Sequence, residues 1–165
     1  MINKLEPYPV ITQQHAKEAG RVLLIYTGGT LGMMKKEGTW LPNPERGYLA
    51  ELIYRMPEFH DESMPDMDMI EYDPLLDSSN IGPKDWCSLA EQIGLHYYDY
   101  DGFVIIHGTD TMAYTASALS FMLEGLGKAV VLTGSIIPMR EPFNDARRNL
   151  IASIMFASQL DLSEV

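Results

Sequence analysis

The sequence of 165 residues contains a single cysteine, Cys87, and no long uninterrupted hydrophobic run. One cysteine cannot form a disulfide within the chain, nor can it build a cysteine-rich metal cluster. Its place on the apolar side of a helix expected after Pro83 predicts a small buried side chain rather than a nucleophile. No apolar run approaches the roughly 20 residues that a membrane-spanning helix needs, so we expect no membrane partner.

Basic residues are also scarce, and the formal net charge is −11. A surface this acidic repels the phosphate backbone of nucleic acids unless a local basic patch overrides it. The late basic cluster of Arg140, Arg147 and Arg148 is interpreted as part of a solvated loop and helix start. We therefore expect no nucleic-acid partner. The N-terminus lacks the apolar core and basic flank of a secretion signal, which favours a cytoplasmic protein.

The composition is that of a soluble globular domain, with 46% hydrophobic and 21% charged residues. A chain of this length builds one core, so one domain is expected over residues 21–165. Residues 1–20 show no clean period and contain two early prolines, Pro7 and Pro9. We expect them to form a loosely packed extension with a short helix near residues 12–19.

Short apolar runs alternate with segments of helical period from residue 22 onward. Runs with the length and residue types of strands occupy residues 22–26, 67–72, 103–106 and 129–132. Helices are expected from Asn43 as cap and Pro44 as first residue, from Pro83, near Met112, and after Asn144 as cap. Strand and helix repeated in this order predict an α/β fold, a parallel sheet with helices on both faces.

Two segments interrupt this regular order. The polar stretch through Lys35 and Lys36 to Gly38 is expected to be mobile. A strand would normally follow the last helix of such a repeat, whereas the sequence stops at Val165. We therefore expect an exposed sheet edge there, which favours self-association.

Two of the expected strands end directly in loops of glycine and hydroxyl residues. These loops are Thr27-Gly28-Gly29-Thr30 and His107-Gly108-Thr109-Asp110-Thr111. Because working residues of a parallel sheet lie beyond the carboxyl ends of its strands, Thr30 and Thr109 are expected at one edge of the sheet. The first loop fits neither the P-loop nor the dinucleotide-binding pattern. A structural turn, an anion site and a nucleophile remain its open interpretations.

Asp110 has two interpretations of its own. It can cap the helix that follows, which is a common role for aspartate. It can also bind a substrate ammonium group or hold a cationic general base in place. One carboxylate oxygen could serve each role, so both interpretations stay open.

Three motifs in this order resemble the bacterial-type L-asparaginases, most closely the cytoplasmic type I branch. They are TGGTLG at 27–32, Asp77-Ser78-Ser79, and GFVIIHGTDTMA at 102–113. The resemblance runs from about residue 22 to residue 135 and implies the N-terminal portion of such an enzyme. It implies hydrolysis of L-asparagine, or a similar small amino-acid amide, to aspartate and ammonia, with no metal or organic cofactor and in a homo-oligomer.

The resemblance also implies a role for each matching residue. Thr30 is the expected nucleophile, which attacks the side-chain amide carbon and forms an acyl-enzyme. Thr109 and Asp110 match the threonine and carboxylate that move protons together with a lysine and bind the substrate amino group. Backbone N–H groups near Thr109 would serve the oxyanion. The substrate's α-carboxylate and α-amino groups are expected in the loop of Asp77, Ser78 and Ser79.

Three features depart from the family pattern. Trp40 stands where type I relatives can carry a tyrosine after the first motif, and Tyr26 and Tyr48 are possible substitutes. Asn80 stands where the family has an aspartate after the two serines. The family lysine and the smaller C-terminal domain fall beyond Val165, so we expect this chain alone to be impaired.

Two other functions remain open. The chain could be a catalytically inactive module that binds an amino acid through Asp110 and the serine loop. It could also be an amidase subunit of an assembly for transfer-RNA-dependent amidation. Binding of asparagine without release of ammonia would favour the first, and ammonia release that needs a partner protein would favour the second.

Overall fold

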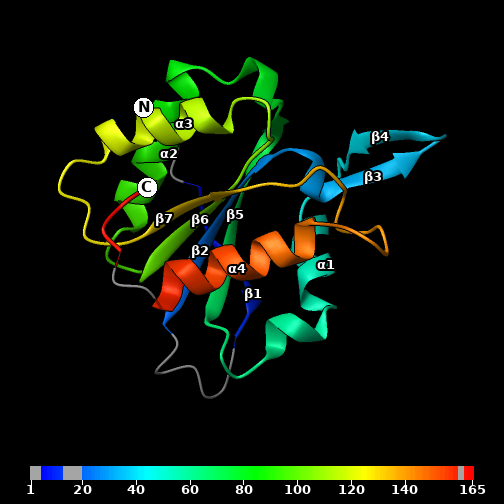
Figure 1. Ribbon diagram of the computed structural model, residues 1–165, viewed down its shortest axis with the longest axis horizontal. Helices are drawn as coiled ribbons and strands as arrows, with labels where there is room; N and C mark the ends of the chain where they lie inside the picture. Colours follow the sequence, from blue (N-terminus) through cyan, green and yellow to red (C-terminus); the bar gives the residue numbers. More distant parts are fainter. Residues whose placement is uncertain (1–4, 13–19, 160–161) are drawn as a thin grey trace.

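The computed structural model describes residues 5–12, 20–159 and 162–165. Its centre is a five-stranded sheet with helices on both faces (Figure 1). In spatial order the strands are β1 (Tyr8–Ile11), β5 (Asp66–Leu76), β2 (Arg21–Gly28), β6 (Gly102–Ile106) and β7 (Val130–Thr133). Neighbours among the last four run parallel, whereas β1 runs antiparallel to β5. The expected α/β fold with a parallel sheet is thus confirmed.

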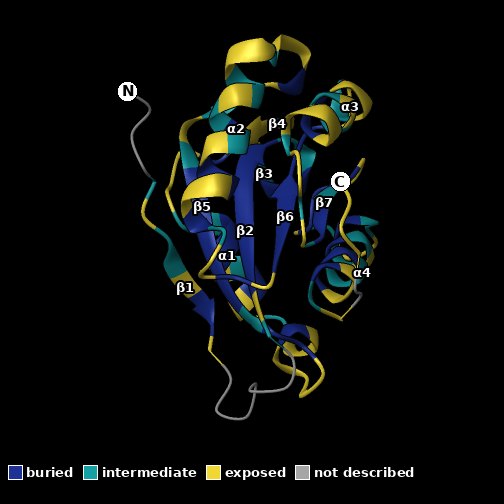
Figure 2. Cartoon of the chain, turned by 90° about the vertical axis from the view of Figure 1, so that its left-hand side faces the viewer, coloured by how far each residue is buried: buried dark blue, intermediate teal, exposed yellow. Residues whose placement is uncertain are grey.

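The four α-helices of the described residues divide between the two faces of the sheet (Figure 1). Along β2, Leu23 and Ile25 pack in one apolar cluster with α2 and α3, whereas Val22 and Leu24 pack in another with α1 and α4. Figure 2 shows the sheet as a buried layer between helices whose outer sides are exposed. A strand that is apolar on both sides is what this layered arrangement requires. The helices are α1 (Tyr48–Tyr54), α2 (Pro83–His96), α3 (Met112–Met122) and α4 (Ala146–Gln159).

Residues near the N-terminus belong to the sheet, so the expectation of a loose extension was wrong for residues 8–11. Val10 and Ile11 of β1 are buried, and Tyr8 donates a hydrogen bond from its hydroxyl to Glu71 Oε2 at 3.0 Å. Four strand residues are too few to show a period in the sequence. Of the short helix expected near residues 12–19, residues 13–19 lie outside the described part of the chain.

The segment after the first motif, which the sequence predicts to be mobile, forms a hairpin. β3 (Met33–Lys36) pairs antiparallel with β4 (Thr39–Pro42). The two residues between them, Glu37 and Gly38, have φ values of 51° and 84°, which suit a two-residue hairpin turn. The hairpin projects beyond the main sheet in Figure 1 and buries few of its side chains, which explains its polar composition.

The helix expected from Asn43 and Pro44 begins later, at Tyr48. Asn43 instead closes a turn, because its Oδ1 accepts a hydrogen bond from the Glu45 N–H at 2.9 Å. Gly47, with a φ of 83°, then turns the chain into α1. Turn and helix cap use the same asparagine chemistry, so the sequence could not separate them.

Cys87 is exposed, so the expectation of a buried cysteine was wrong. It lies on the outer side of α2, since the residues that this helix buries are Leu89, Gln92, Ile93 and His96. Asn144, in contrast, acts as the expected cap of α4. Its Oδ1 accepts a hydrogen bond from the Arg147 N–H at 3.0 Å.

Short 3-10 turns complete the described structure, namely η1 (Thr30–Gly32), η2 (Pro57–His60) and η3 (Ser78–Asn80). Beyond α4 the chain returns to the outer edge of β7, where the Glu164 carbonyl accepts a hydrogen bond from the Val130 N–H at 3.0 Å. The edge that was expected to be bare is therefore partly covered. Across the described ranges, no helix combines the length and the apolar character needed to cross a bilayer.

Candidate functional site

A cavity of about 260 Å³ lies where β2, β5 and β6 end. Its lining includes two glycines, the apolar residues Met33, Pro42 and Leu75, and five of the six residues predicted for the site. Those five are Thr30, Asp77, Ser78, Thr109 and Asp110. The carboxyl edge of a parallel sheet is the usual place for a ligand. Ser79 is the predicted residue that the structure does not place in the lining.

Glycines let three loops meet at the floor of the cavity. A Cβ added to Gly29 would lie 2.7 Å from the Gly108 Cα, and one added to Gly28 would lie 2.3 Å from the Leu76 carbonyl oxygen. A Cβ on Gly108 would lie 2.3 Å from Ser78 Oγ. A side chain cannot be accommodated at such distances. Gly28 and Gly29 therefore contact backbone atoms of Leu76 and Gly108, whereas the backbone of Gly108 packs against the Ser78 side chain. The sequence showed these glycines but not the loops that they contact.

Hydrogen bonds hold the Asp77–Ser79 loop against the His107–Thr111 loop. Thr111 Oγ1 donates to the Ser78 carbonyl oxygen at 2.6 Å. Asp77 Oδ1 accepts the Ser79 N–H at 3.0 Å. Hydrogen bonds from the Ser79 side chain and backbone lower the pKa of the exposed Asp77 carboxyl. Ser79 is thus engaged with Asp77, while the buried Ser78 faces the cavity.

Asp110 does not serve as the helix cap that the sequence left open. α3 begins at Met112, and its cap residue, Thr111, makes no side-chain cap bond. Within the described ranges no hydrogen bond engages the Asp110 carboxylate, and both Thr109 and Asp110 are exposed at the cavity. The carboxylate is therefore available to a ligand.

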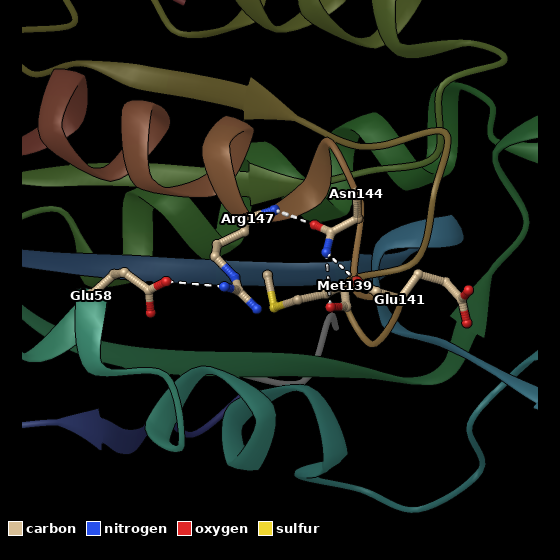
Figure 3. Close-up of polar contacts among 5 residues, drawn as sticks. All are labelled: Glu58, Met139, Glu141, Asn144 and Arg147. Carbon is tan, nitrogen blue, oxygen red and sulfur yellow. Dashed lines mark hydrogen bonds and ion pairs between the residues drawn. The ribbon is translucent and has the colours of Figure 1, made fainter.

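The turn that carries Thr30 is supported from behind by the loop before α4. The Leu31 carbonyl oxygen accepts a hydrogen bond from the Met139 N–H at 3.0 Å. Asn144 Nδ2 in turn donates to the carbonyl oxygens of Met139 at 3.2 Å and Glu141 at 2.5 Å (Figure 3). Asn144 therefore links the start of α4 to the turn of Thr30, a role that its position as a helix cap did not reveal.

The same network extends to η2 through Arg147. Its Nη1 donates to Glu58 Oε1 at 3.0 Å, as Figure 3 shows. Glu58 lies in η2, so the pair joins α4 to the segment that follows α1. Both side chains are about 40% exposed, at 39% and 41%, and exposed pairs of this kind contribute only about 0–1 kcal/mol.

The aromatic residues considered as proton acceptors lie away from the cavity lining. Burial and the nearby Glu71 carboxylate raise the pKa of Tyr26, which therefore stays protonated. The Tyr48 hydroxyl is buried and has no hydrogen-bond partner among the described residues. Trp40 lies in β4, where the Lys35 ammonium sits 5.7 Å from its ring centroid.

His107 is the first residue of the His107–Thr111 loop, and its buried side chain is 1% exposed. Its Nδ1 is 2.6 Å from the Gly108 carbonyl oxygen, and its Nε2 is 3.0 Å from Thr115 Oγ1. Thr115 Oγ1 also accepts a hydrogen bond from Trp86 Nε1 at 3.0 Å. Burial lowers the pKa of His107, so its imidazole is neutral near pH 7. Trp86 and Thr115 lie on separate helices, and no pattern in the sequence indicates that they meet.

Taken together, the lining supplies hydroxyls, carboxylates and backbone groups. It contains no lysine, histidine or tyrosine among the described residues, so a base for the hydroxyls is not part of it. Two carboxylates, Asp77 and Asp110, favour a ligand that carries an ammonium group. Nor do the described ranges contain three His, Cys, Asp or Glu side chains grouped closely enough to hold a metal ion.

Comparisons with known proteins show the family to which the chain is related. The family model described as "Asparaginase, N-terminal" matches residues 21–165. L-asparaginase 1 of Escherichia coli (strain K12) is 52% identical over 144 residues, which cover 87% of this chain and 42% of that protein. A glutamyl-tRNA(Gln) amidotransferase subunit of Methanopyrus kandleri (strain AV19) is 39% identical over 149 residues, with 87% of this chain and 31% of that protein covered.

A solved structure shows the same similarity in three dimensions. The crystal structure of L-asparaginase I from Vibrio cholerae O1 biovar eltor superposes with a TM-score of 0.82 at 46% sequence identity. The superposition covers 88% of this chain and 43% of the Vibrio chain. The present chain thus spans less than half the length of these three relatives.

Proposed function

The chain belongs to the asparaginase family, and from that premise we propose that it carries the nucleophile and the amino-group site of a type I, cytoplasmic L-asparagine amidohydrolase. The observation that carries the proposal is that Thr30, Thr109 and Asp110 line one cavity. These residues come from loops almost 80 positions apart in the sequence. Similarity to L-asparaginase 1 over 87% of the chain supports the same assignment.

In the proposed reaction, Thr30 Oγ1 attacks the side-chain amide carbon of asparagine. Its proton passes to a base, and the tetrahedral intermediate expels ammonia after protonation of the leaving nitrogen, which leaves an ester on Thr30. Water then hydrolyses the ester to aspartate and restores the hydroxyl. We propose that the base is the family lysine expected outside this sequence, because Tyr26 is buried and stays protonated.

Substrate binding uses the charges of the cavity. We propose that Asp110 receives the α-ammonium group, since its carboxylate is exposed at the cavity and engaged by no other described residue. Ser78 and neighbouring backbone N–H groups would hold the α-carboxylate. A charge pair about 4 Å apart contributes roughly 1–4 kcal/mol between bulk water and a protein surface, which suffices to orient a small amino acid.

The test is release of ammonia from L-asparagine by the full-length gene product and by its Thr30→Ala variant. We expect the variant to lose at least about 1,000-fold in kcat, because it removes the hydroxyl that is proposed to attack the amide. Thr12→Ala, which removes an exposed threonine hydroxyl remote from the cavity, is the matched control. Full activity of Thr30→Ala would contradict the proposal. Calorimetric binding of asparagine without turnover in the wild type would favour the inactive binding module instead.

A second candidate is an amidase subunit of a transfer-RNA-dependent amidotransferase. The observation that favours it is the 39% identity to the Methanopyrus amidotransferase subunit over 87% of this chain. Ammonia release that appears only with a partner protein would support this function.

We also propose that the protein works as a homo-oligomer. Large apolar side chains are strongly exposed on the described surface, and two of them, Tyr98 at 93% and Phe121 at 83%, line one surface cavity. Exposed apolar groups of this size are typical of association surfaces when they lie together. Sedimentation of the full-length product tests this, and a monomer at micromolar concentration would contradict it.

A further inference from the structure

A buried row of polar side chains runs from α2 through α3 to the His107–Thr111 loop. It consists of Trp86, Thr115 and His107, joined by hydrogen bonds of 3.0 Å each, and it ends on the Gly108 carbonyl oxygen at 2.6 Å. Thr115 is fully buried and His107 is 1% exposed. None of the three side chains belongs to the cavity lining, so the row lies behind the site and touches it only through Gly108.

The direction of every bond in this row follows from its two ends. The Gly108 carbonyl can only accept, so His107 Nδ1 must carry the hydrogen. In a neutral imidazole Nε2 is then an acceptor, and the Thr115 hydroxyl must donate to it. The indole N–H of Trp86 can only donate, and it does so to the oxygen of that same hydroxyl. A single arrangement therefore satisfies all the groups.

The last bond of the row sets the orientation of one peptide group. The bond between Gly108 and Thr109 is trans, since the cis peptide found in the described residues joins Asp73 and Pro74. In a trans peptide the C=O and the N–H point in opposite directions. Because the Gly108 carbonyl points back to the buried imidazole, the Thr109 N–H points away from it, and Thr109 itself lines the cavity. Within the described ranges no hydrogen bond uses this N–H.

We propose that Thr115 is a positioning residue, which holds His107 in the Nδ1–H form so that His107 keeps the Thr109 N–H directed into the cavity. There the N–H donates to the oxyanion that forms when Thr30 attacks the amide. This inference rests on the function proposed above. It identifies the residues that orient the oxyanion donor before the substrate binds. Loss of one oxyanion donor costs about 100- to 1,000-fold in kcat, and a misdirected donor costs part of that.

The test compares Thr115→Val, which removes the hydroxyl at nearly constant shape, with Thr115→Ser, which keeps it, in the full-length gene product. We expect Thr115→Val to lower kcat about 10- to 100-fold with KM changed by less than about threefold, and Thr115→Ser to retain most of kcat. Ser153→Ala is the matched control, because it removes a buried hydroxyl from α4, on the opposite face of the sheet. Equal losses in Thr115→Ser and Thr115→Val, or in Ser153→Ala, would overturn the proposal.

A spectroscopic measurement detects which imidazole nitrogen of His107 carries the hydrogen, and it does not require turnover. ¹⁵N NMR of the imidazole, assigned by its absence in His107→Gln, should show the Nδ1–H form in the wild type and a loss of that form in Thr115→Val. An Nε2–H form in the wild type overturns the proposal even if Thr115→Val fails to fold. If the wild type releases no ammonia, the proposed function fails, while the imidazole spectrum and the Thr109 amide shift still decide whether Thr115 positions that peptide.

Discussion

Gly108 lies against Ser78 so closely that a Cβ on the glycine would be 2.3 Å from the serine hydroxyl oxygen. The two residues follow different strands, β6 and β5. Their contact joins the loop of Thr109 and Asp110 to the loop of Asp77. Contact between the Gly108 backbone and the Ser78 side chain therefore determines the width of the cavity at this point.

Gly108→Ala should disturb this contact. We expect the free energy of unfolding to fall by about 1–3 kcal/mol, as overpacked substitutions do, and kcat/KM to fall by about 100-fold because the two loops are pushed apart. Denaturant unfolding and ammonia release measure the two effects. Gly94→Ala is the matched control, since no atom lies within 4 Å of its added Cβ and alanine stabilises helices by roughly 0.5–1 kcal/mol. Equal behaviour of the two variants would contradict the role given to Gly108.

Ile11→Ala tests whether the N-terminal strand belongs to the core. Ile11 is 2% exposed and packs in the cluster that contains α1 and α4. Removing three carbons from such a site costs about 2–5 kcal/mol, which thermal or denaturant unfolding detects. Thr12→Ala changes the exposed neighbour and should stay within about 0.5 kcal/mol of the wild type. A loss under about 0.5 kcal/mol for Ile11→Ala would return β1 to the status of a loose extension.

Asn144 offers a substitution that separates its two roles. Asn144→Asp keeps the oxygen that accepts the Arg147 N–H but removes the Nδ2 donor to Met139 and Glu141. Two lost hydrogen bonds cost about 1–3 kcal/mol, and kcat should fall because Met139 supports the turn of Thr30 through Leu31. Asn144→Ala also loses the cap, at about 1 kcal/mol more. If only Asn144→Ala had an effect, Asn144 would be a helix cap alone.

Tyr26→Phe should leave turnover nearly unchanged. Burial and Glu71 raise the pKa of this phenol, so it cannot accept the Thr30 proton near neutral pH, and the residue lies outside the cavity lining. We expect kcat within about threefold of the wild type, since a lost proton-transfer partner typically costs about 100-fold or more. A loss of that size at unchanged stability would identify Tyr26 as the base.

Stability should depend on pH through His107. Burial lowers the pKa of His107 in the folded state, whereas the unfolded chain keeps a value of about 6.5. The unfolded state therefore binds more protons on acidification, and folding stability is lost as the pH falls from about 6.5 through the folded pKa, with a limiting slope of about 1.4 kcal/mol per pH unit. His107→Gln should flatten this slope, whereas the exposed His60→Gln should retain it. An unchanged slope in His107→Gln would show that His107 does not titrate in this way.

Much of the architecture was predictable because its signals are local. Apolar runs predict β2, β6 and β7, and the rule that sites lie at strand ends predicts Thr30 and Thr109 at one edge of the sheet. β1 could not be predicted because a strand of four residues is too short to show a period. The start of α1 is predicted too early because asparagine occurs both in turns and at helix caps. The prediction for Cys87 was wrong because an amphipathic pattern shows which face of a helix is buried but not where that face ends.

The features of the site that the sequence did not predict depend on contacts between segments that lie far apart in the chain. Gly28, Gly29 and Gly108 were visible in the motifs, but their necessity comes from Leu76, Gly108 and Ser78 respectively, which approach them only after folding. The support of the Thr30 turn by Asn144 crosses more than 100 positions of sequence. The role of Thr115 depends likewise on a meeting of two helices. Contacts of this kind leave no periodic pattern or motif in the sequence.

The glycine floor of the cavity has a consequence for efforts to redesign substrate preference. Because the glycine backbones of that floor lie in contact with Leu76, Gly108 and Ser78, variation there would displace the reacting groups along with the ligand. Met33, Pro42 and Leu75 form walls on the β3–β4 hairpin and the end of β5, so their side chains can be enlarged or trimmed independently. Libraries aimed at a longer or bulkier amide should therefore diversify these walls and leave the three loops untouched.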